Sequence, residues 1–271
     1  MARQPLIVIP VEAPVQDTAF DLFETLRAAL AANNQQLQDG DVLAVSSKYT
    51  AISENRVITL ADIEITAEAE LLAERYQMNP RMAQLVLQEA DHIFGGIEGF
   101  LLTAKDGIIS PNAGIDRSNI PSGFAVLFPQ DPYGSAANLR RILRERLGVD
   151  VGVILTDSWL MPGRLGTTGA ALAMAGFKPV QDERGKVDLF GNPMQVTQRG
   201  IADTLCICAQ MVMGERDEAT PFAIIRNSGV PLMDIELSPA DVSISWDMCL
   251  YIQSLTAGLL EPESARRGVT Q

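Results

Sequence analysis

Short apolar runs alternate along the chain with longer segments whose apolar residues recur at helical spacing. Residues 6–11 and 42–45 are apolar runs of strand length, and residues 151–156 form the strongest run of this kind. A short apolar run between turn residues predicts a buried strand. The same pattern predicts further strands at residues 99–103, 107–110, 124–128 and 223–226. We expect the strand at 151–156 to end at Asp157 and Ser158.

Helical spacing predicts several amphipathic helices between these runs. Asp17 and Thr18 can cap a helix that carries Phe20, Phe23 and Leu30 on one side. Further helices are expected over residues 66–90 with a break at Asn79-Pro80, over 198–213, and over 238–258.

The clearest helix signals surround residues 131–148. Asp131 suits the N-cap, Pro132 the first helical position and Gly148 the end of the helix. Four arginines, at positions 140, 141, 144 and 146, lie away from its apolar residues. We interpret them as a solvated face, with an anion-binding patch as the alternative.

Composition narrows the functional classes. The 271 residues include 34 acidic and 21 basic side chains, a net charge of −13, and 47% of residues are hydrophobic. This hydrophobic content excludes a disordered chain, and the acidity argues against binding nucleic acid or an anionic membrane surface. The start of the chain does not have the pattern of a signal peptide, and no run is long enough for a membrane helix. We therefore expect a soluble, cytoplasmic protein.

Polar clusters next to the predicted strand ends are the candidate chemistry. Asp116 lies in a loop rich in Asn, Ser and Gly, and Asp157 follows the strongest strand. Carboxylate and hydroxyl oxygens suit Mg²⁺ or Mn²⁺, which often bridge substrate phosphates. With one histidine and three cysteines, the chain is a poor candidate for a zinc site or a Ser-His-Asp triad. The P-loop motif is absent from the sequence.

Several motifs resemble those of the coenzyme F-420 γ-glutamyl ligases of the CofE type. The most specific is the run Asn112-Ala113-Gly114-Ile115-Asp116 with Ser118-Asn119 and Pro121, a pattern that any residue at position 117 satisfies. The order and spacing of the motifs match the family over roughly residues 5 to 228. The other matching motifs are Gly40-Asp41-Val42-Leu43 with Ser47-Lys48, Asp157-Ser158, Arg164 with Gly166, Asp188 with Gly191, Val196-Thr197, Ala202-Asp203 and Val212-Met213-Gly214-Glu215.

The resemblance implies a fold and an activity. The fold would be α+β, with mixed sheets, flanking helices, a ligand groove between subdomains and a dimeric assembly. Residues 1–271 would form a single ligase unit, with a β-rich subdomain around residues 160–197. The activity would be GTP- and divalent-metal-dependent addition of L-glutamate to a carboxylate on the phospholactyl tail of a deazaflavin. Transfer of the γ-phosphoryl group would form an acyl phosphate, which the glutamate amine would attack.

The resemblance also implies site residues. Asp116 and Asp157 would be catalytic. Together with Ser158 and Glu215 they would bind Mg²⁺ or Mn²⁺, and a monovalent cation is a further candidate cofactor. GTP, the co-substrate, would contact Ser47, Lys48, Asn119, Ser158, Arg164, Met213, Gly214 and Glu215.

Three positions depart from the family pattern. Ile52 and Met161 replace a lysine and an arginine, and Gly169 replaces an aspartate. The loss of two cations near the groove leaves the acceptor and the preference between GTP and ATP open. Two alternatives therefore stay open: a ligase acting on a different small-molecule carboxylate, and a nucleotide- or cofactor-binding paralogue without ligase activity.

Overall fold

A mixed five-stranded sheet forms the centre of the protein. We describe residues 4–260 of a computed structural model. The parallel pair at the middle of the sheet is flanked by antiparallel neighbours, and its apolar runs are fully buried, as the sequence predicts. The strand order is β1 (Ile7–Val11), β12 (Phe222–Arg226), β2 (Val42–Ser46), β8 (Gly152–Leu160) and β9 (Thr167–Ala175).

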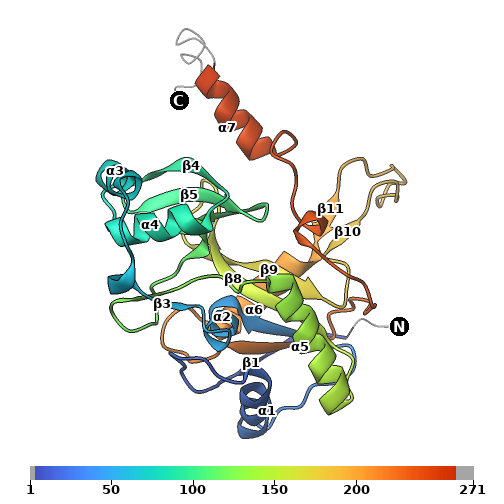
Figure 1. The fold of residues 1–271 in the computed structure, drawn as a ribbon. Helices are drawn as coiled ribbons and strands as arrows, with labels where there is room; N and C mark the ends of the chain where they lie inside the picture. The colour runs from blue at the N-terminus through green and yellow to red at the C-terminus, as the bar shows by residue number, and fades with distance from the viewer. Residues whose placement is uncertain (1–3, 261–271) are drawn as a thin grey trace.

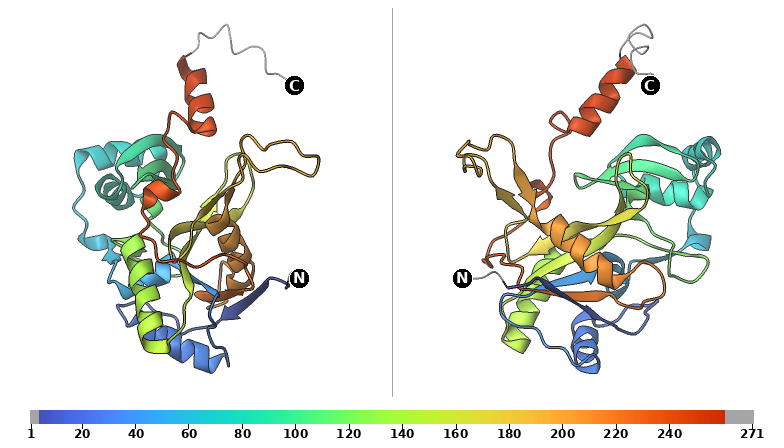
Figure 2. Two further views of the ribbon diagram at one scale, coloured as in Figure 1. Left: turned by 90° about the vertical axis from the view of Figure 1, so that its right-hand side faces the viewer. Right: turned by 180° about the vertical axis from the view of Figure 1, so that it is seen from behind.

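Helices cover both faces of this sheet. Figure 2 shows α5 (Pro132–Leu147) on one face and α6 (Ile201–Met213) on the other. Leu139 and Leu143 of α5, and Leu205 and Ala209 of α6, are buried in the main core with the strands. Two shorter helices, α1 (Leu22–Ala32) and α2 (Ser47–Ser53), flank β2 in the chain.

A second, smaller layer surrounds the three-stranded antiparallel sheet β4-β5-β6. Its core is separate from the main one and includes Leu85, Val86, Leu101 and Leu127. The elements of this part are β3 (Val57–Thr59), α3 (Ala67–Tyr76), α4 (Pro80–Glu89), β4 (His92–Ile97), β5 (Phe100–Lys105), β6 (Ile108–Pro111) and β7 (Phe124–Val126).

Two segments extend away from the layers. The strands β10 (Val180–Asp182) and β11 (Gln198–Gly200) pair at the base of an arm whose connecting loop is exposed. The C-terminal segment first contacts α5, where Arg140 and Arg144 bind Asp234. It then reaches β4, and α7 (Leu250–Leu260) projects from the body in all three views. Within residues 4–260, no helix combines the length and the hydrophobicity needed to cross a bilayer.

The pairing of β8 with β9 contains a bulge. Leu155 lies opposite Ala173, but the next residue, Thr156, lies opposite Ala171, so Leu172 is an extra residue in β9. The ladder continues past Asp157, which lies opposite Ala170. The predicted end of the strand at Asp157-Ser158 is therefore wrong. Both residues are strand residues, because β9 supplies hydrogen-bond partners that the sequence of β8 does not reveal.

Three predicted helix boundaries also need correction, and the first is the helix over 198–213, because residues 198–200 form strand β11 and α6 begins at Ile201. Asp21 caps α1 by accepting a hydrogen bond from the backbone N–H of Glu24, so the cap is not at Asp17 or Thr18. The predicted helix over 238–258 is helical only in its last part, α7, and in the short turn Pro239–Asp241. Between them, the ring of Trp246 packs against those of His92 and Phe94. These contacts hold the segment in an irregular conformation.

Candidate active site

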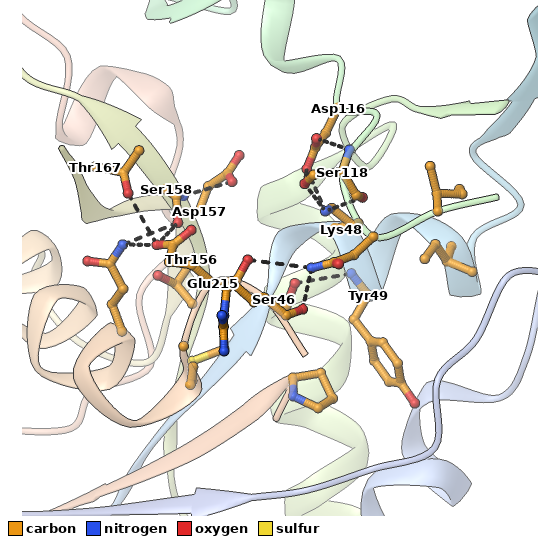
Figure 3. A pocket seen from close by; sticks show the side chains of 18 of the residues that line it. Ser46, Lys48, Tyr49, Asp116, Ser118, Thr156, Asp157, Ser158, Thr167 and Glu215 are labelled. Atoms are coloured by element: carbon orange, nitrogen blue, oxygen red, sulfur yellow. Dashed lines mark hydrogen bonds and ion pairs between the residues drawn. The ribbon is translucent and has the colours of Figure 1, made fainter. Parts of the chain in front are cut away.

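A pocket of about 910 Å³ opens where β2 ends and its parallel pairing with β8 stops, at Ser46 and Thr156. The carboxyl ends of adjacent parallel strands are a common position for ligand sites, because several loops converge there. Ser46 closes β2, and Thr156 to Ser158 line the pocket from β8. The other walls come from the loop 111–121 and the loop 213–221. Figure 3 shows two polar clusters on opposite sides of this pocket, with Asp157 between them.

The first cluster is centred on Asp116 and Lys48. The Lys48 Nζ atom lies 2.5 Å from Asp116 Oδ2 and donates hydrogen bonds of 2.8 and 2.9 Å to the carbonyl and hydroxyl oxygens of Ser118. The backbone N–H of Ser118 donates to Asp116 Oδ1 at 2.7 Å. Burial raises the pKa of Asp116, but the Lys48 charge and the hydrogen bonds from Lys48 and Ser118 outweigh it, so the pKa falls below its usual value.

An unusual turn positions Asp116. Asn112, Ala113 and Gly114 all adopt the left-handed conformation, with φ between 51° and 72°. The buried Asn112 side chain accepts a hydrogen bond of 2.9 Å from the Leu101 N–H, which ties the turn to β5. A Cβ atom at Gly114 would lie about 2.0 Å from the ring of Phe128, so only glycine fits there. The turn is therefore fixed by the packing beneath it.

Asp157 has a different environment from Asp116. Its pKa is raised to about 6, mainly by burial and further by the negative charge of Asp116. Hydrogen bonds from the Ser158 N–H and from Ser47, and the more distant Lys48, offset this only in part. Among residues 4–260, no cationic side chain forms an ion pair with Asp157 as Lys48 does with Asp116.

The second cluster is centred on Glu215. Its Oε1 atom accepts hydrogen bonds from the hydroxyls of Ser158, at 2.6 Å, and Thr167, at 3.4 Å. The side-chain amide of Gln210, on α6, donates to the same carboxylate and also to the Ser158 hydroxyl. This cluster joins β8, β9 and α6 at one wall of the pocket.

Asn119 connects the two sides. Its side-chain amide donates to the carbonyl oxygen of Arg216 at 2.6 Å, and more weakly to that of Glu215 at 3.5 Å. The backbone of Asn119 is left-handed, with φ of 50°, a conformation that asparagine tolerates better than most residues. The loops 111–121 and 213–221 are therefore held together across the pocket mouth.

The structure gathers most of the predicted site residues and leaves two outside the pocket lining. Ser47 is buried beneath the pocket, next to Asp157, and Arg164 is exposed in the loop between β8 and β9. The residues that do line the pocket are Lys48, Asp116, Asn119, Asp157, Ser158, Met213, Gly214 and Glu215.

Three residues of the clusters are not among the site residues predicted from the sequence. Ser118 binds Lys48 and Asp116, and Gln210 and Thr167 bind Glu215. Ser118 belongs to the motif at 112–119, so that motif could have indicated it. Gln210 had no local signal, since its role depends on the way α6 packs beside β8.

The donor set fits a hard divalent cation. All candidate ligands are carboxylate or hydroxyl oxygens, and the raised pKa of Asp157 is what a buried carboxylate shows next to a second acid without its own cation. Three acidic, histidine or cysteine side chains do not converge on one point anywhere in residues 4–260. Mg²⁺ does not require such a set, because it is usually bound by one or two carboxylates together with water and substrate phosphates.

The three departures from the family pattern have different surroundings. Ile52 lines the pocket and packs in a small apolar cluster with Ala51 and Val126. Met161 is half exposed and does not line the pocket. A Cβ atom at Gly169 would lie 2.6 Å from the carbonyl oxygen of Cys206, so the close approach of β9 to α6 admits only glycine here.

Comparisons with known proteins place the chain in a family. The profile of the family described as "F420-0:Gamma-glutamyl ligase" matches residues 10–227. The coenzyme F420:L-glutamate ligase of Methanopyrus kandleri is 40% identical over 200 residues, which are 73% of this chain and 79% of that protein. The ligase of the same name from Archaeoglobus fulgidus is 35% identical over 224 residues, 82% of this chain and 88% of that protein.

A third relative has the same named activity and a similar degree of identity. The coenzyme F420:L-glutamate ligase of Methanothermobacter thermautotrophicus is 34% identical over 214 residues, 79% of this chain and 85% of that protein. The matched region contains every residue of the two polar clusters, from Lys48 to Glu215. The protein is a ligase enzyme, and the chain belongs to the F420-0:gamma-glutamyl ligase family.

Proposed function

We infer that the protein adds L-glutamate to a carboxylate of the coenzyme F-420 precursor in a reaction driven by GTP and a divalent metal ion. One observation carries this inference: a single large pocket contains an acid paired with a lysine, Asp116, and an acid without a cation, Asp157. A polyanionic nucleotide needs positive charge in such a pocket, and a bound divalent cation supplies it. The relatives' names supply the two substrates.

The chemistry proceeds in two steps. A carboxylate oxygen of the acceptor attacks the γ-phosphorus of GTP, the bond to the β–γ bridging oxygen breaks, and GDP leaves. The glutamate amine then attacks the acyl carbon, and the carbon–oxygen bond to phosphate breaks. The products are an amide, phosphate and one proton. Neither step requires a covalent bond to the protein, so positioning and electrostatic stabilisation carry the catalysis.

The residues of this pocket have separate roles in the proposal. Lys48 keeps Asp116 ionised and adds positive charge near the phosphates. Asp157 and Asp116, with Ser158 and Glu215, would hold the cation. When bound, a divalent ion neutralises charge on the transferring phosphoryl oxygens. The Asn119 contact to the loop 213–221 closes one side of the pocket and limits access of water to the acyl phosphate.

A homodimer is part of the same proposal. The exposed arm and the loop between β8 and β9 carry large apolar side chains that are almost fully accessible, including Leu165, Leu189 and Phe190. Large apolar side chains that extend into solvent from projecting loops are suited to contact with a protein partner. A second copy of the chain would cover them.

The experiment is a set of reactions with the purified full-length protein. GDP release and formation of the glutamylated deazaflavin are followed by chromatography and mass spectrometry, with GTP, L-glutamate and Mn²⁺ or Mg²⁺. We expect product only when all components are present, and we expect EDTA to abolish it. Controls replace GTP by ATP, L-glutamate by D-glutamate, and the deazaflavin by other small carboxylates. Product with another carboxylate alone would replace the deazaflavin as the acceptor, and metal-independent product would contradict the proposal.

A further inference from the structure

A second pocket of about 420 Å³ lies on the other side of the loop that carries Asp116. Its walls come from the turn between α3 and α4, the turn between β4 and β5, and the loop 112–118. It shares five lining residues with the first pocket, so the two hollows meet along this loop: Phe100, Asn112, Ile115, Asp116 and Ser118.

The second pocket is lined by side chains that can donate hydrogen bonds to an anion. Arg117, Gln77 and Asn79 line it. Within residues 4–260, no hydrogen bond or ion pair engages the guanidinium of Arg117 or the amide NH₂ groups of Gln77 and Asn79. The chain has an excess of 13 acidic residues, yet Asp116 is the only acid in the lining of this pocket. Its charge is already matched by Lys48.

The rest of the lining suits a short aliphatic chain. Met78, Met82, Phe100 and Ile115 provide apolar contacts. A free guanidinium, two amides and an apolar wall together fit a small dicarboxylate with a methylene chain. The pocket is less than half the volume of the first, which leaves the larger space to the nucleotide and the deazaflavin.

We propose that this second pocket is the amino-acid subsite of the ligase, with Arg117 binding a carboxylate of L-glutamate. The proposal rests on the proposed function, since it assigns one of the substrates of that reaction. The amine of a glutamate bound here faces the first pocket across Asp116 and Ser118, where the acyl phosphate forms. Arg117 is thus a substrate-binding residue that determines specificity for an acidic amino acid.

The test is steady-state kinetics of the Arg117→Gln variant of the full-length protein. We expect the KM for L-glutamate to rise about tenfold or more, because a charge-assisted contact is lost, with the KM for GTP unchanged within twofold. Arg117→Lys keeps the positive charge and should recover part of the loss. Arg141→Gln, on the exposed face of α5 and paired there with Glu145, is the matched control and should behave as wild type.

Two results would overturn the proposal: an unchanged KM for glutamate in Arg117→Gln, or a rise in the KM for the acceptor instead. Arg117 is exposed and has no described partner, so the variant should fold, and an unchanged Tm confirms this. If the proposed function itself were wrong, the wild-type protein would yield no glutamylated product, which distinguishes that outcome from a failure of the subsite proposal. In that case, equilibrium binding of L-glutamate to wild type and to Arg117→Gln, with GTP and Mn²⁺ present, still tests the pocket. Equal binding by both proteins would rule it out.

Discussion

Asp116 and Asp157 line the same pocket, yet the pKa values of their carboxyl groups are shifted in opposite directions. Asp116 has a lowered pKa, because Lys48 and Ser118 bind its charged form. Asp157 has a pKa raised to about 6, because burial and the charge of Asp116 disfavour its charged form. Asp116, in the loop 111–121, therefore has a charge that Lys48 already compensates. Asp157, in β8, is the acid that a bound cation would stabilise most.

This difference suggests distinct roles for the two acids, with Asp116 ordering its loop and Asp157 binding the ligand. An ionised acid that is paired with a cation can order a loop without a further ligand. An ionised acid without such a partner raises the free energy of the folded protein until a cation binds to it. Asp157 is thus the residue on which metal and nucleotide binding should depend most. The predictions below test this contrast from its largest expected effect to its smallest.

Asp157→Asn should have the largest effect, on catalysis. The amide keeps the shape of the side chain and removes its charge, so metal-dependent ligation should fall by about 100-fold or more in kcat/KM. Product formation at saturating Mn²⁺ is the measurement. Asp62→Asn, an exposed aspartate outside both pockets, is the control. Wild-type turnover in Asp157→Asn would remove Asp157 from the metal site.

The same variant should be more stable than wild type when metal is absent. The folded-state pKa of Asp157 lies above the unfolded value of about 3.8, so the folded state binds more protons and loses stability as pH rises from about 4 to about 6. Asparagine avoids this cost, and the gain above pH 6 should be about 3 kcal/mol. Urea unfolding in EDTA at pH 4 and pH 7.5 measures it. An equal difference between the two proteins at both pH values would contradict the explanation.

Lys48→Met should have the smallest effect of the three and should bring the pKa values of Asp116 and Asp157 closer together. Without the lysine charge and hydrogen bond, burial is opposed at Asp116 only by the hydrogen bonds from Ser118, so the pKa of Asp116 should rise. Carboxyl NMR titration measures this pKa directly. The apparent affinity for GTP should fall by about tenfold, because a cation next to the phosphates is lost. An unchanged Asp116 pKa would mean that Ser118 alone sets its charge state.

Local sequence signals predicted those parts of the fold that depend on neighbouring residues. Helix α5 begins after Asp131 and ends before Gly148, as expected, because an N-cap aspartate, a first-turn proline and a C-terminal glycine act within a few residues. The apolar runs of β2 and β8 predicted buried strands for the same reason. The α+β class was implied by the family resemblance.

Distant contacts explain what the sequence could not reveal. Arg140 was predicted to lie on a solvated face, but it is buried and forms ion pairs with Asp150 and Asp234, of which the second is 94 residues away in the chain. Gln210 reaches Glu215 only because of the position of α6. The second pocket could not be predicted either, since its walls come from three segments that meet only in the folded chain.

The bulge at Leu172 has a consequence for how the length of β9 can vary among relatives. In a regular strand, adding or removing one residue turns every following side chain to the opposite face. At a bulge, two residues already stand opposite one, so a chain with a regular β9 would lack one residue there and still keep position 169 against α6. Sequences of this family should therefore tolerate a one-residue gap at position 172, whereas a gap at 170 or 171 would turn the residue at position 169 to the other face of the sheet.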